Sequence, residues 1–209
     1  AADLNNDSSI DYTDLNLLRD FMLDCNAEKI TPERITKYNG IDVSRWQGDI
    51  NWEQVKAAGI DFVMIKAGDG TQTESSFIKN ITGAKNAGIQ CGIYWFANAR
   101  SVEDAHTEAK VCLDVISKYQ LEYPVVYDFE YGTLNNNNPL ASDRVRCPEA
   151  VNAFLGDIEA AGWYAMVYTN KDFPQRYLNL NEITSRYALW YANYSISHPD
   201  VQCSMWQYS

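Results

Sequence analysis

The amino-acid sequence predicts an α/β fold in which parallel strands curl into an irregular barrel. From Asn39 onward, short apolar runs alternate with amphipathic stretches, which is the pattern of βαβ units on a parallel sheet. Three of the amphipathic stretches end in an Ala-Gly pair, at residues 58–59, 87–88 and 161–162. Glycine is the usual residue just past a helix end, so each pair marks the step from a helix to the next strand.

The first half of this region alternates strictly between strands and helices. Strands rich in β-branched and aromatic residues are expected at Ile41–Ser44, Phe62–Lys66 and Gly92–Ala97. The helical patterns between them cover Trp52–Ala58 and Ser76–Ala87. An Ala-Gly pair closes each of these helices, and the apolar run that follows begins the next strand.

The second half begins in the same way and then loses its helices. A helix at Val102–Tyr119 precedes a strand at Val125–Asp128, and a helix at Pro148–Ala161 precedes a strand at Ala165–Thr169. The last two strands are expected at Tyr187–Ala192 and Ser204–Tyr208, with no helical pattern between them. Regular βα units followed by strands with no helix between them favour a barrel. A flavodoxin-like open sheet is the alternative. The region is far shorter than the roughly 250 residues of a regular eightfold barrel, which argues against that architecture. No glycine-rich phosphate loop follows the first strand, which argues against a nucleotide-binding open sheet.

Composition excludes several classes of function. The net charge of −11 is unsuited to a phosphate backbone, so nucleic acid is not an expected partner. No apolar run approaches the roughly 18 residues of a membrane-spanning helix. The five cysteines form no Cys-x-x-Cys pair, which argues against a zinc site, and their odd number leaves at least one thiol unpaired. Aromatic residues make up 13% of the chain, enough to line a groove as well as to fill a core.

Residues 1–38 differ from the rest of the chain in their residue pattern and are expected to form a separate small segment. Residues 3–14 read DLNNDSSIDYTD, which places oxygen-bearing side chains at the ligand positions of an EF-hand-like calcium loop. The expected ligands are Asp3, Asn5, Asp7, Ser9 and Asp14. Position 6 of the loop is Ser8 instead of glycine, and position 12 is an aspartate instead of a glutamate. A solvated acidic arm followed by a capped helix is the alternative.

The run DLNNDSSIDYTDLNLLRDFML, residues 3–23, resembles one repeat of a type I dockerin, in which aspartate at position 12 is normal. The resemblance implies one structural Ca²⁺ and a cohesin module as a partner. Dockerins carry two such repeats and only one is visible, so a lone repeat that packs on its neighbour is an equal alternative. The two alanines at the start fit the end left by a cleaved signal peptide, and a secreted or cell-wall-associated protein is expected.

Two carboxylates follow the strand expected at Val125–Asp128. Asp128 and Glu130 are two residues apart, so in extended geometry they share a face while Phe129 points to the other. The carboxyl ends of barrel strands form the active site. Two carboxyl groups there repel each other and raise the proton affinity of one, which separates an acid from an ionised carboxylate, as glycosidases require. The alternative is a surface Asp-x-Glu at the end of a strand.

Asp42 lies inside the first expected strand, where a charged side chain is costly unless it faces a polar cavity. The residues around it, GIDVSRWQG at 40–48, resemble the opening of glycoside hydrolase family 25, the Chalaropsis-type lysozymes. The likeness continues in order through INW at 50–52, VKAAG at 55–59, FVMIKA at 62–67, GIYWF at 92–96, YDFE at 127–130, YTN at 168–170, LWYA at 189–192 and WQY at 206–208.

The resemblance implies an irregular TIM-like (β/α)5(β)3 barrel and a lysozyme. Such an N-acetylmuramidase cleaves the β-1,4 bond between N-acetylmuramic acid and N-acetylglucosamine in peptidoglycan, with retention of configuration. By position, Glu130 matches the general acid/base, Asp128 the carboxylate that assists the 2-acetamido group or attacks directly, and Asp42 the aspartate that orients the substrate. The implied substrate contacts are Tyr94, Lys66, Asp69, Tyr168, Trp190 and Gln207. No cofactor is implied for catalysis, and a monomer is expected.

Two departures from the family pattern bear on these expectations. Asp69 stands in Ala-Gly-Asp-Gly where many members have Ala-Thr-Glu-Gly. Relatives also continue past the last Trp-Gln-Tyr to an aspartate near the barrel mouth, whereas this sequence ends at Ser209. The barrel domain, residues 39–209, is therefore expected to be truncated, with an eighth strand beyond Ser209. The alternative is that the N-terminal segment takes the place of the missing strand. A non-catalytic or weakly active glycan-binding module is the alternative function.

Overall fold

The computed structural model describes residues 37–134, 137–143 and 145–209. The chain divides into one unit of residues 1–38 and a second of residues 39–209, and the fold described below is that of the second unit. The predicted calcium loop and the dockerin-like repeat around it, residues 3–23, lie outside the described residues.

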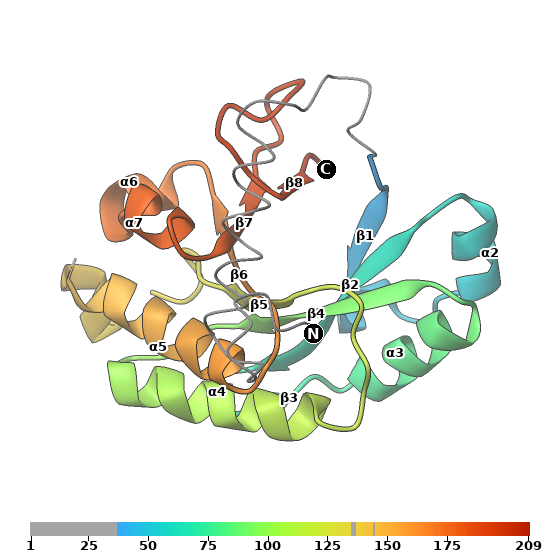
Figure 1. Ribbon diagram of the computed structural model, residues 1–209, viewed down its shortest axis with the longest axis horizontal. Coiled ribbons are helices and arrows are strands. Elements are labelled where there is room, and N and C mark those ends of the chain that lie inside the picture. Colours follow the sequence, from blue (N-terminus) through green and yellow to red (C-terminus); the bar gives the residue numbers. More distant parts are fainter. Residues whose placement is uncertain (1–36, 135–136, 144) are drawn as a thin grey trace, which may run out of the picture. The chain divides into compact units, whose positions relative to one another are not determined.

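A parallel sheet that follows the order of the chain is the centre of the fold (Figure 1). Its strands are β1 (Gly40–Val43), β2 (Phe62–Asp69), β3 (Gln72–Thr73), β4 (Gln90–Phe96), β5 (Val125–Asp128), β6 (Ala165–Asn170), β7 (Ala188–Ala192) and β8 (Met205–Gln207). All except β3 pair in parallel, in the order β1-β2-β4-β5-β6-β7-β8, while β3 pairs antiparallel with the end of β2. The order shows none of the reversal of a doubly wound sheet, so the flavodoxin-like alternative is wrong.

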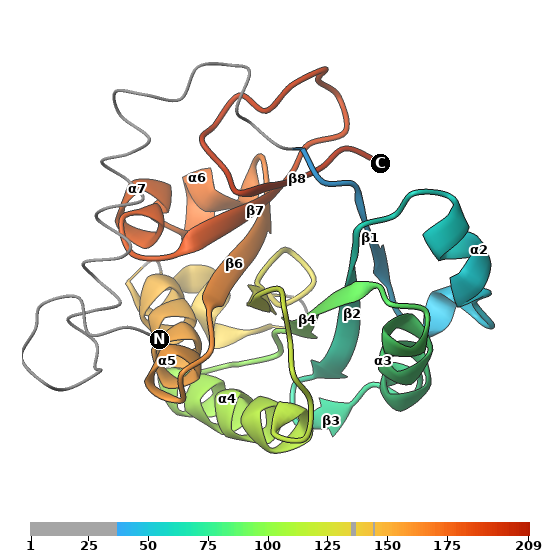
Figure 2. The same cartoon turned by 45° about the vertical axis from the view of Figure 1, so that its right-hand side comes forward.

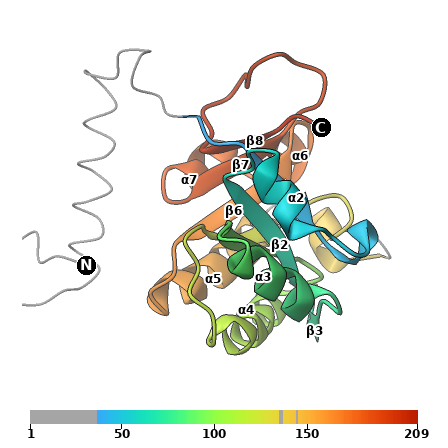
Figure 3. The same ribbon diagram turned by 90° about the vertical axis from the view of Figure 1, so that its right-hand side faces the viewer.

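Helices connect most of the strands and lie on the outer side of the curled sheet (Figure 2). They are α2 (Trp52–Ala57), α3 (Phe77–Asn86), α4 (Val102–Ile116), α5 (Arg146–Ala160), α6 (Phe173–Tyr177) and α7 (Leu180–Thr184), with 3-10 turns η2 (Arg45–Gln47) and η3 (Pro139–Ser142). In the side view, α3 lies over β2 (Figure 3) and contacts β2 and β4, while α5 contacts β5 and β6. The protein is thus an α/β fold with a curled parallel sheet, as predicted.

The two edges of the curled sheet are β1 and β8. Within the described residues, β1 pairs only with β2, and β8 only with β7. A side chain nevertheless joins the two edges, because the Gln207 amide Nε2 donates to Asp42 Oδ2 across 2.8 Å. The eighth barrel strand expected beyond Ser209 stays a prediction.

The seven predicted barrel strands and four predicted helices all occur, in the predicted order. Gly59, Gly88 and Gly162 follow their helices at φ values of 80°, 69° and 85°, which confirms the Ala-Gly signal. The sequence analysis missed β3, η2, η3, α6 and α7. Each of these spans only two to five residues, too few for an apolar period to show.

Strand β2 continues three residues beyond its predicted end at Lys66, to Asp69. Its pairing with β4 shifts register between Lys66 and Gly68, which is a β-bulge. A Cβ atom added at Gly68 would lie 2.1 Å from the Trp95 ring, so only glycine allows this indole to lie against the strand. The bulge and the glycine carry Asp69 to the rim of the sheet.

Side chains on the two faces of the sheet form separate clusters. One face packs against the helices through fully buried residues such as Val63, Ile65 and Val125. The alternate residues, Met64, Val126, Met166 and Trp190, form a smaller cluster on the concave face. Period-two alternation therefore decides which residues enter the interior of the curl.

Candidate active site

The predicted site residues occupy the concave face at the carboxyl ends of the strands. Residues that pair directly across parallel strands share a face. Asp42 pairs with Met64, and Lys66 pairs with Tyr94. Asp128 pairs with Tyr168, which pairs with Trp190. The register therefore brings these positions together from β1, β2, β4, β5, β6 and β7, as the sequence predicts.

Asp128 is the most deeply buried carboxyl group of the site, with 8% of its surface exposed. Its Oδ1 has no hydrogen-bond partner among the described residues. Burial raises the pKa of Asp128 well above its usual range, and the nearby charges of Glu130, Asp42 and Asp69 raise it further, while Lys66 opposes them. This oxygen is itself buried, so no hydrogen bond within the described residues offsets the cost of its burial.

Glu130 follows β5 in a tight turn. Its backbone N–H donates to Thr133 Oγ1 at 3.2 Å, and the Thr133 N–H donates to the Glu130 carbonyl at 3.0 Å. Phe129 between the two carboxylates is fully buried on the other side, against Phe173. Burial raises the pKa of Glu130 and Lys66 lowers it. The predicted pair is thus formed, with both carboxyl groups biased toward their protonated forms.

Asp42 is held by a network that reaches from β8 to β1. Gln207 donates to Asp42 through Nε2, while its Oε1 accepts hydrogen bonds from Tyr168 OH at 2.9 Å and Tyr194 OH at 2.8 Å. A carboxylate only accepts hydrogen bonds, so the NH2 end of the amide faces Asp42 and the amide oxygen is left for the two hydroxyl groups. Gln207, predicted as a substrate contact, therefore also orients Asp42.

Lys66 and Asp69 form an ion pair at the rim, with Nζ 2.9 Å from Oδ2. Lys66 Nζ also lies 4.9 Å from the centre of the Phe96 ring, a cation–π geometry. The other oxygen of Asp69 accepts a hydrogen bond from the side-chain amide of Asn98. Asp69 is thus held between Lys66 and Asn98 at the rim of the site.

Three aromatic rings form one wall of the site. Trp190 contacts both Tyr94 and Tyr168 edge-on, with ring centroids 6.2 and 4.9 Å apart. Burial raises the pKa of the Tyr94 hydroxyl, and the charges of Asp42 and Asp128 raise it further. Both tyrosines are therefore neutral hydroxyls at physiological pH and can donate hydrogen bonds to a sugar.

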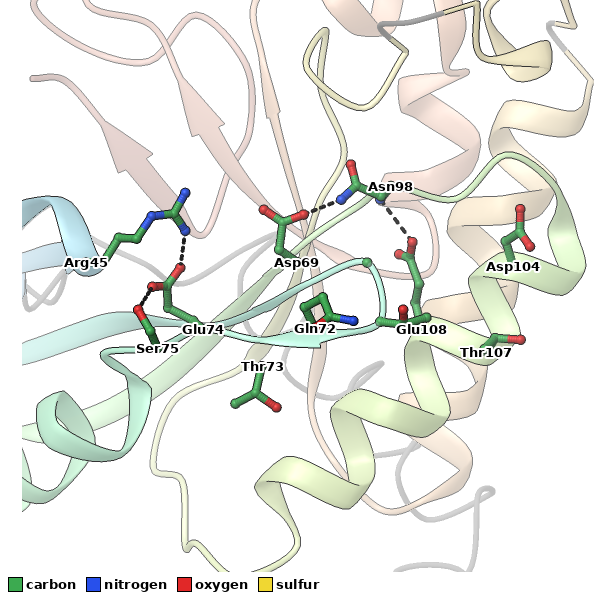
Figure 4. Close-up of a pocket in the computed structure, with 12 residues that line it drawn as sticks. Arg45, Asp69, Gln72, Thr73, Glu74, Ser75, Asn98, Asp104, Thr107 and Glu108 are labelled. Carbon is green, nitrogen blue, oxygen red and sulfur yellow. Dashed lines mark hydrogen bonds and ion pairs between the residues drawn. The ribbon is translucent and has the colours of Figure 1, made fainter.

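Asn98 and Tyr194 were not predicted from the sequence. Each stands two residues after a strand end, Asn98 after β4 and Tyr194 after β7. Their position at the carboxyl edge was the available signal, but loop side chains have no period that shows where they point. A cavity of about 610 Å³ beside Asp69 is lined by Asn98, by residues 70–75 and by the start of α4 (Figure 4).

The predicted calcium ligands Asp3, Asn5, Asp7, Ser9 and Asp14 lie outside the described residues, so that site stays a prediction. Within residues 37–134, 137–143 and 145–209, no group of three or more His, Cys, Asp or Glu side chains is arranged to hold a metal ion. Among the same residues, no helix is long and apolar enough to cross a membrane.

Comparisons with known proteins identify the family of the chain. Residues 41–209 match glycosyl hydrolases family 25. The chain is 33% identical over 173 residues to the autolytic lysozyme of Clostridium acetobutylicum, and the match covers 81% of this chain and 50% of that protein. The chain therefore spans about half the length of that relative.

Solved structures show the same fold. The bacterial lysozyme from Streptomyces coelicolor superposes with a TM-score of 0.74 at 29% identity, covering 84% of this chain and 85% of that one. The modular autolysin LytC from Streptococcus pneumoniae, in complex with a synthetic peptidoglycan ligand, gives a TM-score of 0.70 at 26% identity, covering 81% of this chain and 42% of that one. With the curled sheet, the carboxylate pair and a family match over residues 41–209, the chain belongs to glycosyl hydrolases family 25.

Proposed function

We propose that this chain is a peptidoglycan hydrolase that cleaves the β-1,4 bond between N-acetylmuramic acid and N-acetylglucosamine with retention of configuration. The observation that carries the proposal is the carboxylate pair of Asp128 and Glu130. Both groups lie at the end of β5 inside the curled sheet, and burial raises the pKa of each. Lysozymes among the relatives and solved structures support the same substrate.

In the proposed reaction, Glu130 donates its proton to the glycosidic oxygen as the bond to the anomeric carbon breaks. Asp128 accepts a hydrogen bond from the N–H of the 2-acetamido group, which aims the acetamido oxygen at the anomeric carbon. The acetamido oxygen bonds to the anomeric carbon as the leaving sugar departs. Glu130, now ionised, then removes a proton from water, and the water oxygen attacks that carbon and displaces the acetamido oxygen, which restores the acetamido group. Direct attack by Asp128 on the anomeric carbon is the other route, and both routes retain configuration.

Burial raises the pKa of both carboxyl groups, and Lys66 opposes the rise at each. In the proposed reaction, a hydrogen bond from the acetamido N–H to Asp128 stabilises the ionised form of Asp128. Glu130 then carries the proton that the glycosidic oxygen receives.

The test combines lysis with product analysis. Purified chain is incubated with peptidoglycan, turbidity is followed, and the new reducing ends are identified by mass spectrometry. New N-acetylmuramic acid ends that are lost in Glu130→Gln are the expected result. New N-acetylglucosamine ends would assign a different bond. Binding to peptidoglycan without any new reducing ends would show the alternative, a glycan-binding module.

The finer features of the fold and the setting of the protein are also proposals. We propose that the complete domain is a (β/α)5(β)3 barrel, supported by the seven strands in chain order, and that the protein acts as a monomer outside the cell or at the wall. We further propose that residues 1–38 bind one structural Ca²⁺ and dock a cohesin module, supported by the loop spacing. Calorimetric titration with Ca²⁺ and then with a cohesin tests both points, against a variant that replaces Asp3 and Asp7 by alanine.

A further inference from the structure

Glu108 is a buried carboxyl group that the proposed reaction does not use. It lies on α4 with 3% of its surface exposed. Its Oε2 accepts a hydrogen bond from Tyr127 OH at 2.8 Å, and its Oε1 accepts one from the backbone N–H of Asn98 at 3.0 Å. Both donors are uncharged, so they compensate only part of the cost of burying an ionisable group. Burial accordingly raises the pKa of Glu108 to about 7. If Glu108 only filled space, an apolar side chain would stabilise the fold more, because its burial carries no desolvation cost.

Each of the two contacts leads toward the active site. Tyr127 immediately precedes Asp128 on β5. Asn98 follows β4, and its side-chain amide donates to Asp69 Oδ1 (Figure 4). Asp69 in turn holds Lys66 through its other oxygen. A continuous chain of contacts therefore runs from α4 to the ion pair beside the catalytic carboxylates.

The link between Asn98 and Asp69 needs an anchor. Asn98 is exposed, and a contact between an exposed amide and a partly exposed carboxylate is weak when its ends are free to move. Glu108 holds Asn98 in place, because its Oε1 accepts a hydrogen bond from the backbone N–H of Asn98 on the buried side. Without the buried carboxyl group, this hydrogen bond is lost.

The ion pair acts on the catalytic carboxylates through its charges. Lys66 lowers the pKa of both Asp128 and Glu130, and Asp69 raises that of Asp128. Asp69 therefore offsets the positive charge of Lys66 only while it stays beside it. If Asp69 moves away, the positive charge of Lys66 is no longer offset, and the pKa of the neighbouring carboxyl group of Asp128 falls.

We propose that Glu108 is a positioning residue for the reaction: it fixes Asn98, and through Asn98 it holds Asp69 against Lys66 beside Asp128 and Glu130. Its effect on hydrolysis rests on the proposed function, whereas its effect on the carboxylate pair does not.

The test measures the titration of Asp128 by carboxyl ¹³C NMR, and kcat and KM on soluble peptidoglycan fragments. Glu108→Ala and Asn98→Ala should each lower the pKa of Asp128, which Asp69 raises, and the double variant should lower it no more than Asn98→Ala alone. Glu108→Gln keeps an acceptor for the Asn98 N–H and should leave this pKa unchanged. In Glu108→Ala, kcat should fall about tenfold with little change in KM, and the basic limb of its pH profile should move to lower pH.

Tyr127→Phe is the matched control, because it removes the other hydrogen bond of Glu108 and leaves Asn98 held. It should lower the melting temperature without moving the pKa of Asp128. The proposal is overturned if Glu108→Ala behaves like this control, or if the effects of Glu108→Ala and Asn98→Ala add. Should Glu108→Ala fail to fold, Glu108→Asp, which withdraws the carboxyl by one methylene, replaces it with the same expected shift. A wild-type chain without hydrolysis would refute the proposed function, while the NMR titrations would still decide on Glu108.

Discussion

One amide, that of Gln207, joins the first and last strands of the sheet. It accepts from Tyr168 and Tyr194 and donates to Asp42, so each of its polar ends is used and none is free to rotate. Asp42 is therefore held in one orientation on a sheet edge that has no strand partner on that side within the described residues. The orientation of Asp42 therefore depends on a side-chain hydrogen bond, whereas the other site residues on strands are positioned by backbone pairing.

Replacing the Gln207 amide by a carboxyl group should lower the activity in a way that depends on pH. In Gln207→Glu a second carboxyl faces Asp42, and the repulsion between them raises the pKa of the pair. We expect kcat/KM at pH 7 to fall about tenfold and to recover toward pH 5, where the shared proton removes the repulsion. Tyr194→Phe keeps the contact with Asp42 and should change kcat/KM less than threefold. A loss independent of pH in Gln207→Glu would contradict this account.

Asp128 and Glu130, the two carboxyl groups of the proposed reaction, should respond differently when each is replaced by its amide. Glu130→Gln keeps size and polarity but has no transferable proton, so kcat should fall by about 100-fold or more. Asp128→Asn removes the negative charge next to the developing cation and should be nearly as damaging. Circular dichroism checks that both variants fold. A substrate with a good leaving group needs less acid assistance and should restore Glu130→Gln more than Asp128→Asn.

The active-site residues on strands could be predicted from the sequence, and those in loops could not. Asp42, Asp128 and Trp190 lie in short apolar runs, so alternation and chain order already place them on one face at one edge of the sheet. Asn98 and Tyr194 follow strand ends in loops. Their roles depend on partners 29 and 13 residues away in sequence, which no local pattern reports.

Among the elements, long and periodic ones were predicted and short ones were not. Helices α4 and α5 each run for 15 residues, long enough for an apolar face to repeat. Helices α6 and α7 have five residues each. Strand β3 has two residues and exists only because β2 bulges at Gly68 and turns back at Gly70. Such elements result from tertiary packing, which the sequence pattern does not contain.

The bulge in β2 should be intolerant of a side chain at Gly68. In Gly68→Ala the new Cβ would meet the Trp95 ring at 2.1 Å, and the overlap should lower the free energy of unfolding by about 1–3 kcal/mol. Urea denaturation measures this loss. Gly156→Ala is the control, since Gly156 lies inside α5 with its nearest atoms 3.8 Å from an added Cβ. That variant should be unchanged or more stable by up to about 1 kcal/mol.

The closeness of Gly68 and Trp95 can be tested by compensation. Trp95 Nε1 donates to the Gly70 carbonyl at 2.8 Å, so the indole also holds the turn that leads to β3. Trp95→Phe gives back space but loses this hydrogen bond. The double variant Gly68→Ala/Trp95→Phe should therefore be more stable than the sum of the two single losses predicts. Simple additivity would mean that the strand relieves the overlap by moving elsewhere.

The whole domain should be more stable in mild acid than in mild base. Glu108, Asp128 and Glu130 are acids whose pKa values are raised in the folded protein. Between their ordinary and raised values, the folded state binds more protons than the unfolded state, so the free energy of unfolding falls as pH rises. For Glu108 the window runs from its usual 4.5 to about 7. The full shift corresponds to at most roughly 3 kcal/mol.

Urea denaturation at pH 5 and pH 8 checks this dependence. The midpoint should be lower at pH 8, and Glu108→Gln should narrow the difference, because its amide does not titrate and keeps the acceptor for Asn98. Asp200 and Glu122 act in the opposite sense, since their pKa values are lowered in the fold. Their contribution changes only below about pH 4.5, outside the range compared. A midpoint that rises from pH 5 to pH 8, or an unchanged difference in Glu108→Gln, would mean that Glu108 is ionised in the folded protein at both pH values.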